Sequence, residues 1–144
     1  MAEFSIKNDP LRDKTFLFAV RIVNLYRYLV ENKKEYVLSK QILRSGTNPG
    51  AMVREAANAE SGADFIHKLA VGLKETGETQ YWLELLWKTN YLSEPEFQSI
   101  NADAIEVLKL LTSSIVTKKK KMALKVTATV AISLIFFLLF INNH

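Results

Sequence analysis

Four long segments of this sequence carry apolar residues at every third or fourth position, the spacing of one face of an α-helix. In the first, Phe18, Ile22, Leu25 and Leu29 follow that spacing. A strand-like run such as YVLSKQIL, residues 36–43, has neither a partner run nor a hairpin turn. We therefore predict an all-α fold, an antiparallel up-down four-helix bundle with short connections.

The expected helices cover residues 11–32, 37–59, 63–91 and 94–117. In the first of them, three further apolar residues widen the apolar stripe, so this helix should be buried on more than one side. These residues are Phe16, Val20 and Val23.

Local signals bound these helices. Ser61 is a typical N-cap with Asp64 three positions on, and Ser93 with Glu96 has the spacing of a capping box. The stretch ENKKE, residues 31–35, is expected to be a polar, solvated turn.

The basic charge is confined to the C-terminal end. Residues 1–117 hold 14 basic and 15 acidic residues, a net charge of −1, whereas residues 118–144 hold five lysines and no acid. This weakens a general RNA-binding function for the folded part but leaves room for a local basic patch. We propose two parts: the bundle over residues 1–117, and a polybasic linker with a hydrophobic C-terminal helix over 118–144.

The C-terminal part has the composition of a membrane anchor. Residues 126–141 carry no charge, and counting from Met122 gives 20 residues, about 30 Å of helix if Lys125 extends toward the headgroups. The membrane-proximal basic residues are Lys118, Lys119, Lys120, Lys121 and Lys125. Because basic flanks favour the cytoplasmic side, we expect a cytoplasmic bundle attached to the inner membrane through residues 122–141. The other interpretation is that this segment packs elsewhere.

No enzyme motif occurs. The chain has no cysteine and no glycine-rich phosphate loop, and its two histidines do not complete a Glu-x-x-His pair with Glu75, Glu78 or Glu84. We expect no catalytic residue, no metal, no cofactor and no small-molecule substrate.

Four cations in the bundle are candidates for contact with nucleic acid or a protein partner. They are Arg44, Arg54, Lys74 and Lys88. Phosphate binding requires Arg44, Arg54 and Lys74 to share one exposed face, and the alternative is that such charges form inter-helix ion pairs. Aromatic residues of YWLELLW, residues 81–87, fit either core packing or base stacking.

Three sequence motifs occur together in a known order. They are LRSGTNPGAMVREA, SGADFIHKL and KETGETQYWLELL, all within residues 41–86. In these motifs the chain resembles the four-helix-bundle family of proteins encoded in 23S ribosomal RNA intervening sequences, relatives of the accessory variability proteins of diversity-generating retroelements. The resemblance covers roughly residues 8–118. It implies a left-handed four-helix bundle, a homopentameric ring and no enzyme activity, with nucleic-acid binding suggested for the family.

The resemblance also places residues 45–56 inside the second helix, where small residues let helices approach. Pro49 lacks a backbone N–H and clashes one turn back, at a cost of about 3 kcal/mol. We therefore predict either a kink at Asn48, Pro49 and Gly50, or a short break with Asn48 capping a helix that restarts at Pro49.

Two functions follow from the sequence. The first is a non-enzymatic, oligomeric binding or adaptor protein, attached to a membrane by its tail. The alternative is an accessory protein that binds RNA or a ribonucleoprotein.

Overall fold

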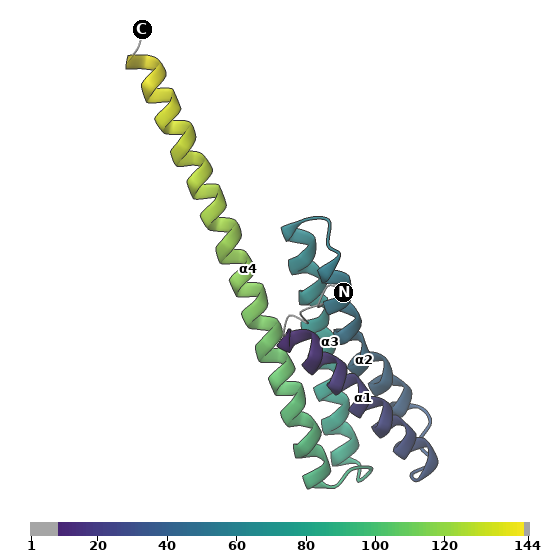
Figure 1. Cartoon of the computed structure of the whole chain (residues 1–144). Coiled ribbons are helices and arrows are strands. Elements are labelled where there is room, and N and C mark those ends of the chain that lie inside the picture. Colours follow the sequence, from purple (N-terminus) through teal and green to yellow (C-terminus); the bar gives the residue numbers. More distant parts are fainter. Residues whose placement is uncertain (1–8, 143–144) are drawn as a thin grey trace, which may run out of the picture.

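The computed structural model describes residues 9–142, and these residues form four helices without a strand (Figure 1). The helices are α1 (Pro10–Glu31), α2 (Leu38–Ala57), α3 (Gly62–Lys88) and α4 (Glu94–Asn142). The all-α class and the four-helix architecture are confirmed.

Side-chain pairs show that α2 and α3 run antiparallel. Between α2 and α3, Lys68 pairs with Glu55 at 2.8 Å close to the connecting turn, whereas Arg44 pairs with Glu78 at 2.7 Å far from it. Residues nearer the N-terminus of α2 thus lie beside residues nearer the C-terminus of α3, as in a helical hairpin. Each helix packs against the next one in the chain, and α4 contacts both α3 and α1, which closes the bundle.

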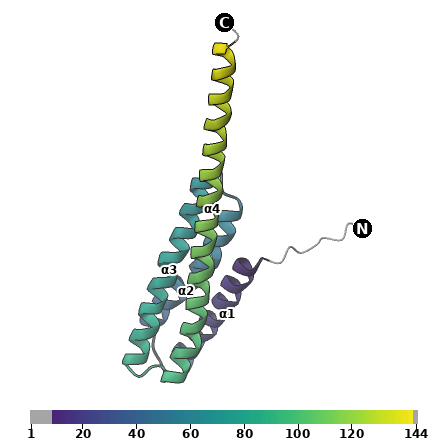
Figure 2. The same ribbon diagram turned by 90° about the vertical axis from the view of Figure 1, so that its left-hand side faces the viewer.

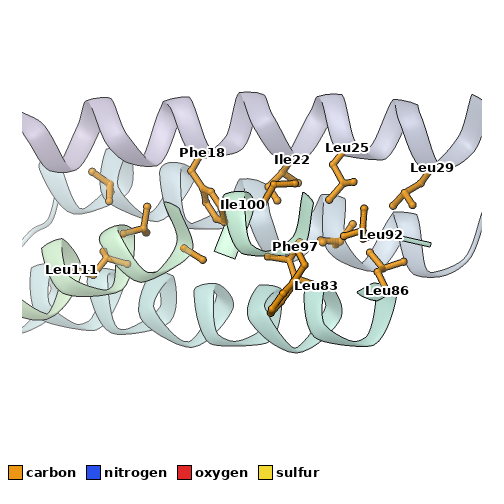
Figure 3. Packing of buried hydrophobic residues seen from close by; sticks show 14 of the residues in the cluster. Phe18, Ile22, Leu25, Leu29, Leu83, Leu86, Leu92, Phe97, Ile100 and Leu111 are labelled. Atoms are coloured by element: carbon orange, nitrogen blue, oxygen red, sulfur yellow. The ribbon is translucent and has the colours of Figure 1, made fainter. Parts of the chain in front are cut away.

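The core is a single apolar cluster to which every helix contributes (Figure 3). From α1 the four residues spaced for one helix face, Phe18, Ile22, Leu25 and Leu29, are all buried, as their spacing indicates. Burial of each such side chain stabilises the fold by about 1.5–3 kcal/mol. The buried apolar residues of the other helices are Ile42, Val53, Ala56, Leu69, Leu83, Leu86, Phe97, Ile100, Ala104, Val107 and Leu111.

The helix starts follow the expected caps. The Ser61 hydroxyl accepts a hydrogen bond from the Asp64 backbone N–H at 3.0 Å, and the Glu96 carboxylate accepts one from the Ser93 N–H at 2.7 Å. The Glu96 N–H in turn donates to the Ser93 hydroxyl at 3.4 Å, which completes the capping box. These contacts satisfy backbone donors that the first turn of a helix leaves free.

The turn between α1 and α2 differs from the expectation of a solvated loop. Glu35 is buried, and its carboxylate accepts hydrogen bonds from the backbone N–H groups of Val37, Leu38 and Ser39 at 3.0, 2.9 and 2.6 Å. Burial alone would raise the pKa of Glu35, but these hydrogen bonds outweigh it and hold the pKa below 4.5. Glu35 thus caps α2 from outside the helix, because Val37 has no side chain that could do so.

Helix α2 is continuous through Pro49, so the alternative of a break capped by Asn48 is wrong. Close packing on both sides of the proline holds the helix together. A Cβ added at Gly46 would lie 2.6 Å from Ile22 Cγ1 on α1, and one added at Gly72 on α3 would lie 3.6 Å from the Pro49 Cα. The small residues therefore bring the backbone of α2 close to its neighbours, as the family resemblance implies.

Helix α1 is not buried on more than one side within a single chain. Phe16 is 53% exposed and Val20 is 41% exposed, and Leu17 beside them is 57% exposed. The core-facing stripe is thus narrower than the apolar stripe of the sequence, and the remainder forms an exposed apolar face. We call Phe16, Leu17 and Val20 the α1 apolar face.

The fourth helix does not end at Thr117, because α4 continues to Asn142 as a single helix of 49 residues. Nothing between Glu96 and Asn142 interrupts it, since this stretch contains no proline or glycine. The lysine cluster at 118–121 is therefore helical. The last part of α4 extends beyond the other helices and away from the bundle (Figures 1 and 2).

Candidate membrane-contacting helix and basic residues

The protruding part of α4 starts where its contacts with α3 end. Phe65 and Gly62, in the first turn of α3, face Lys118 and Met122 of α4. Beyond Met122, every described residue of α4 is exposed. Residues 123–142 therefore form a free helix about 30 Å long at 1.5 Å per residue, equal to the thickness of the hydrocarbon core of a bilayer. We call this stretch the free helix.

The free helix is apolar on all sides. Its most apolar 18-residue window has a mean hydropathy of 2.4, and none of that window is buried; by length and composition it can cross a membrane. Twelve of its large apolar side chains are more than half exposed, namely Leu124, Val126, Val130, Ile132, Leu134, Ile135, Phe136, Phe137, Leu138, Leu139, Phe140 and Ile141. At about 1.5–3 kcal/mol for each side chain removed from water, covering them is worth on the order of 20 kcal/mol.

The two threonine hydroxyls within the free helix are satisfied internally. The hydroxyl of Thr127 donates to the Ala123 carbonyl at 3.1 Å, and that of Thr129 donates to the Lys125 carbonyl at 2.9 Å. A helix also pairs its own backbone groups, which is the main requirement for a segment in lipid. The free helix therefore presents few unpaired polar groups to a bilayer.

The lysine cluster surrounds α4 at the base of the free helix. Because consecutive residues of a helix are 100° apart, Lys118, Lys119, Lys120 and Lys121 together point to all sides of the helix axis. Lys125 lies one turn farther on and is exposed. No acid follows Glu106 in the sequence, so this positive charge is not balanced within α4.

The bundle cations do not form the shared face that phosphate binding would require. Arg44 lies on the side of α2 facing α3, where Glu78 pairs with it at 2.7 Å and Glu75 lies 3.9 Å away. Arg54 lies on the side facing α1, with its guanidinium 5.6 Å from the centre of the Phe16 ring. The two arginines thus occupy opposite edges of α2.

The remaining two candidates lie on α3. Lys74 is exposed and adjoins Glu78 at helical spacing, and Lys88 places its ammonium 3.7 Å from the centre of the Trp87 ring. Trp87 itself stacks on Phe97 with ring centres 4.6 Å apart, and Trp82 donates from Nε1 to the Glu78 carboxylate at 3.1 Å. Both tryptophans are therefore structural, whereas Tyr81 is 58% exposed.

Acidic residues and histidines do not gather into a metal site within residues 9–142. His67 is exposed on α3, and His144 lies outside the described residues. Asp64, the acid three residues before His67, accepts a hydrogen bond from the Glu60 N–H at 3.2 Å.

A groove of about 380 Å³ at the base of the free helix was not foreseen from the sequence. Its lining combines residues of α3 and α4 that are distant in sequence: Phe65, Ser113, Ser114, Thr117, Lys118 and Lys121. The lysines were identified as membrane-proximal, but their grouping with Phe65 depends on the register of α3 against α4. No local pattern in the sequence reports that register.

Comparisons with known proteins agree with the fold. A family model described as 23S rRNA-intervening sequence protein matches residues 9–113. Among solved structures, a protein of unknown function from the S23 ribosomal protein family of Bacteroides thetaiotaomicron is 57% identical, with a TM-score of 0.73. The match covers 74% of this chain and 95% of that chain. No curated protein matches.

Proposed function

The chain belongs to the family of 23S rRNA-intervening sequence proteins, and we propose that this member is a non-enzymatic, homo-oligomeric binding protein held at a membrane by the free helix. The observation that carries the proposal is the free helix itself. A helix as long as the hydrocarbon core is thick, apolar on all sides and exposed along its described length, is strongly disfavoured in water.

The charge distribution supports one orientation. The lysine cluster lies on the bundle side of the free helix, whereas no lysine or arginine follows Lys125. Because lysines and arginines favour the cytoplasmic side, the bundle would lie in the cytoplasm and Asn142 at the opposite membrane surface. In this arrangement the turn between α2 and α3 faces the membrane, since it lies at the end of the bundle from which the free helix leaves (Figure 1).

The α1 apolar face supports self-association. Phe16, Leu17 and Val20 are exposed together on one helix, and Leu17 and Val20 also line a groove of about 470 Å³ between α1 and α4. Contiguous apolar surface on a folded domain usually marks an interface. A second copy of the chain would bury this face, and the family resemblance points to a ring of five copies.

The alternative function, RNA binding through the bundle, receives less support from the positions of the cations. Arg44 is paired with acids, and Arg54 lies on the other edge of α2. We expect residues 1–117 alone, which lack the lysine cluster, to show no salt-dependent retention of RNA in a filter assay. Tight retention that weakens with salt would reverse this ranking, because phosphate contacts release counterions.

Membrane fractionation tests the proposed attachment. The full chain and a chain ending at Met122 would be expressed in bacteria, and the membranes would be washed with alkaline carbonate. We expect the full chain to stay in the washed membranes and the shorter chain to be soluble. Recovery of the full chain in the soluble fraction as a defined oligomer would overturn the proposal, because the free helices would then cover one another in water.

A further inference from the structure

The groove at the base of the free helix opens beyond the point where α1 begins. Lys14, one turn into α1, pairs with Glu106 of α4 at 3.2 Å, so α1 begins only about one turn farther along the bundle. Both views show α1 starting part-way along α4 (Figures 1 and 2). Beyond that level, no helix formed by residues 9–142 lies beside one flank of α4, and there the groove opens between α4 and Phe65 of α3.

The lining of the groove has the chemistry of an anion site. Lys118 and Lys121 contribute two ammonium groups, and neither forms an ion pair within residues 9–142. In the same described range the hydroxyls of Ser114 and Thr117 have no hydrogen-bond partner, whereas that of Ser113 donates to the Leu110 carbonyl at 3.0 Å. Two cations and two free hydroxyls therefore face one small volume.

Within residues 9–142, acidic groups do not line this groove. The acids of this described range at the same end of the bundle are Glu60 and Asp64, in the turn before α3 and in its first helical turn. Asp64 is engaged there, since its carboxylate accepts a hydrogen bond from the Glu60 N–H. An apolar wall is supplied by Phe65, whose ring centre lies 5.2 Å from the Lys118 ammonium.

The end of the groove that holds Lys118 and Lys121 lies at the height of lipid headgroups if the free helix spans the bilayer. Thr117 precedes the start of the free helix by six residues, about 9 Å, and Lys121 by two residues, about 3 Å. The headgroup layer is about 5–8 Å thick on each side of the hydrocarbon core. A lipid phosphate at the membrane surface would thus lie beside Lys121 and within reach of the Lys118 side chain.

We propose that this groove binds the phosphate headgroup of an anionic membrane lipid. Lys118 and Lys121 pair with the phosphate, the hydroxyls of Thr117 and Ser114, which lie farther from the hydrocarbon core, donate to headgroup oxygens that extend into the groove, and Phe65 forms the apolar wall of the groove. The inference rests on the proposed membrane attachment and adds a specific lipid contact to it.

The lysine cluster supplies its own matched control. Lys118 and Lys121 line the groove, whereas Lys119 and Lys120 do not, although all four are neighbours in sequence. The double variants K118A/K121A and K119A/K120A therefore remove the same charge at the same height. The full chain and both variants would be purified in uncharged detergent, and binding of phosphatidylglycerol would be measured by native mass spectrometry.

We expect K118A/K121A to weaken phosphatidylglycerol binding about tenfold, and K119A/K120A less than about twofold, since only the first pair contacts the bound phosphate. The conservative variant S114A/T117V, which keeps every charge, should weaken binding about threefold. Equal losses for the two lysine pairs would overturn the proposal, because the cluster would then act only through its overall charge.

Two further ligands identify the source of the phosphate. Phosphatidylcholine, which has no net charge, should bind the full chain more weakly than phosphatidylglycerol. Inorganic phosphate should displace phosphatidylglycerol only at much higher concentration, and displacement at equal concentration would show a site for free phosphate instead. The carbonate wash distinguishes failure of this proposal from failure of the proposed membrane attachment. If the chain stays in washed membranes but the two lysine pairs weaken lipid binding equally, the attachment is supported and the lipid site is not.

Discussion

Replacing Gly46 by alanine tests the close approach of α1 and α2. The added Cβ would lie 2.6, 2.9 and 3.0 Å from Ile22 Cγ1, Cγ2 and Cδ1, whereas carbon atoms in contact prefer about 3.5–4.0 Å. Ile22 is fully buried, so its side chain cannot turn into solvent. The helices must therefore separate, or Ile22 must leave its preferred rotamer.

The expected cost follows from two opposing terms. Overpacking a core costs about 1–3 kcal/mol, and replacing glycine by alanine inside a helix returns about 1 kcal/mol. We expect G46A to lower the free energy of unfolding by about 1 kcal/mol. At Gly77, on the exposed side of α3, nothing lies within 4 Å of an added Cβ, so G77A should raise it by about 1 kcal/mol.

Urea unfolding of residues 1–122, which we call the bundle fragment, measures both changes. The crystallised relative aligns over 95% of its own length with 74% of this chain, and we therefore expect the bundle to fold without the free helix. The two variants should differ by about 2 kcal/mol, a difference of roughly 8 °C in Tm for a domain of this size. If both variants were stabilised equally, the tight contact between Gly46 and Ile22 would be wrong.

Three other predictions concern the cap, the apolar face and the free helix. Because the folded state holds the pKa of Glu35 below 4.5, its stabilisation is present above that value and is lost as the pH falls through the folded pKa. In the bundle fragment, E35Q should thus lower the free energy of unfolding by about 1–2 kcal/mol at pH 7, measured by urea unfolding. On acidification the variant should lose less of that free energy than the wild type, and identical pH profiles would contradict the capping role of Glu35. L17D/V20D should lower the mass measured by light scattering with little change in folding, whereas V37D at the opposite end of the bundle should not; an unchanged mass would exclude the α1 apolar face as an interface. On the membrane-insertion scale, where each Leu, Ile, Phe or Val contributes only about −0.3 to −0.6 kcal/mol, L134D places a charge in the middle of the free helix at a cost of about 3 kcal/mol. It should therefore lower the fraction of the chain that stays in carbonate-washed membranes, and an unchanged fraction would count against insertion.

Features set by neighbouring residues could be predicted from the sequence. The buried face of α1 follows from its spacing, and the caps at Ser61 and at Ser93 with Glu96 involve contacts three residues apart. The unbroken length of α4 was not predicted, although lysine is a good helix former and no glycine or proline separates the bundle part from the apolar part.

Features that depend on tertiary packing could not be predicted in this way. Glu35 is buried because the start of α2 presents three backbone N–H groups to its carboxylate. The polar composition of residues 31–35 gives no sign of this burial. Pro49 could end or interrupt a helix by local rules, and only the close packing at Gly46 and Gly72 decides for continuity. The separation of Arg44 from Arg54 likewise depends on which neighbouring helix each edge of α2 faces.

Single cysteines along α4 test most directly whether the free helix crosses a membrane. The natural chain has no cysteine, so one cysteine placed at Lys119, Leu134 or Asn142 would be the sole site for a membrane-impermeant maleimide. In intact cells we expect labelling at 142 only, and in inverted membrane vesicles labelling at 119 only, with 134 protected in both. If position 134 were labelled in membranes as fast as in the chain unfolded by denaturant, the free helix would lie in water. That result would contradict a free helix that crosses the membrane.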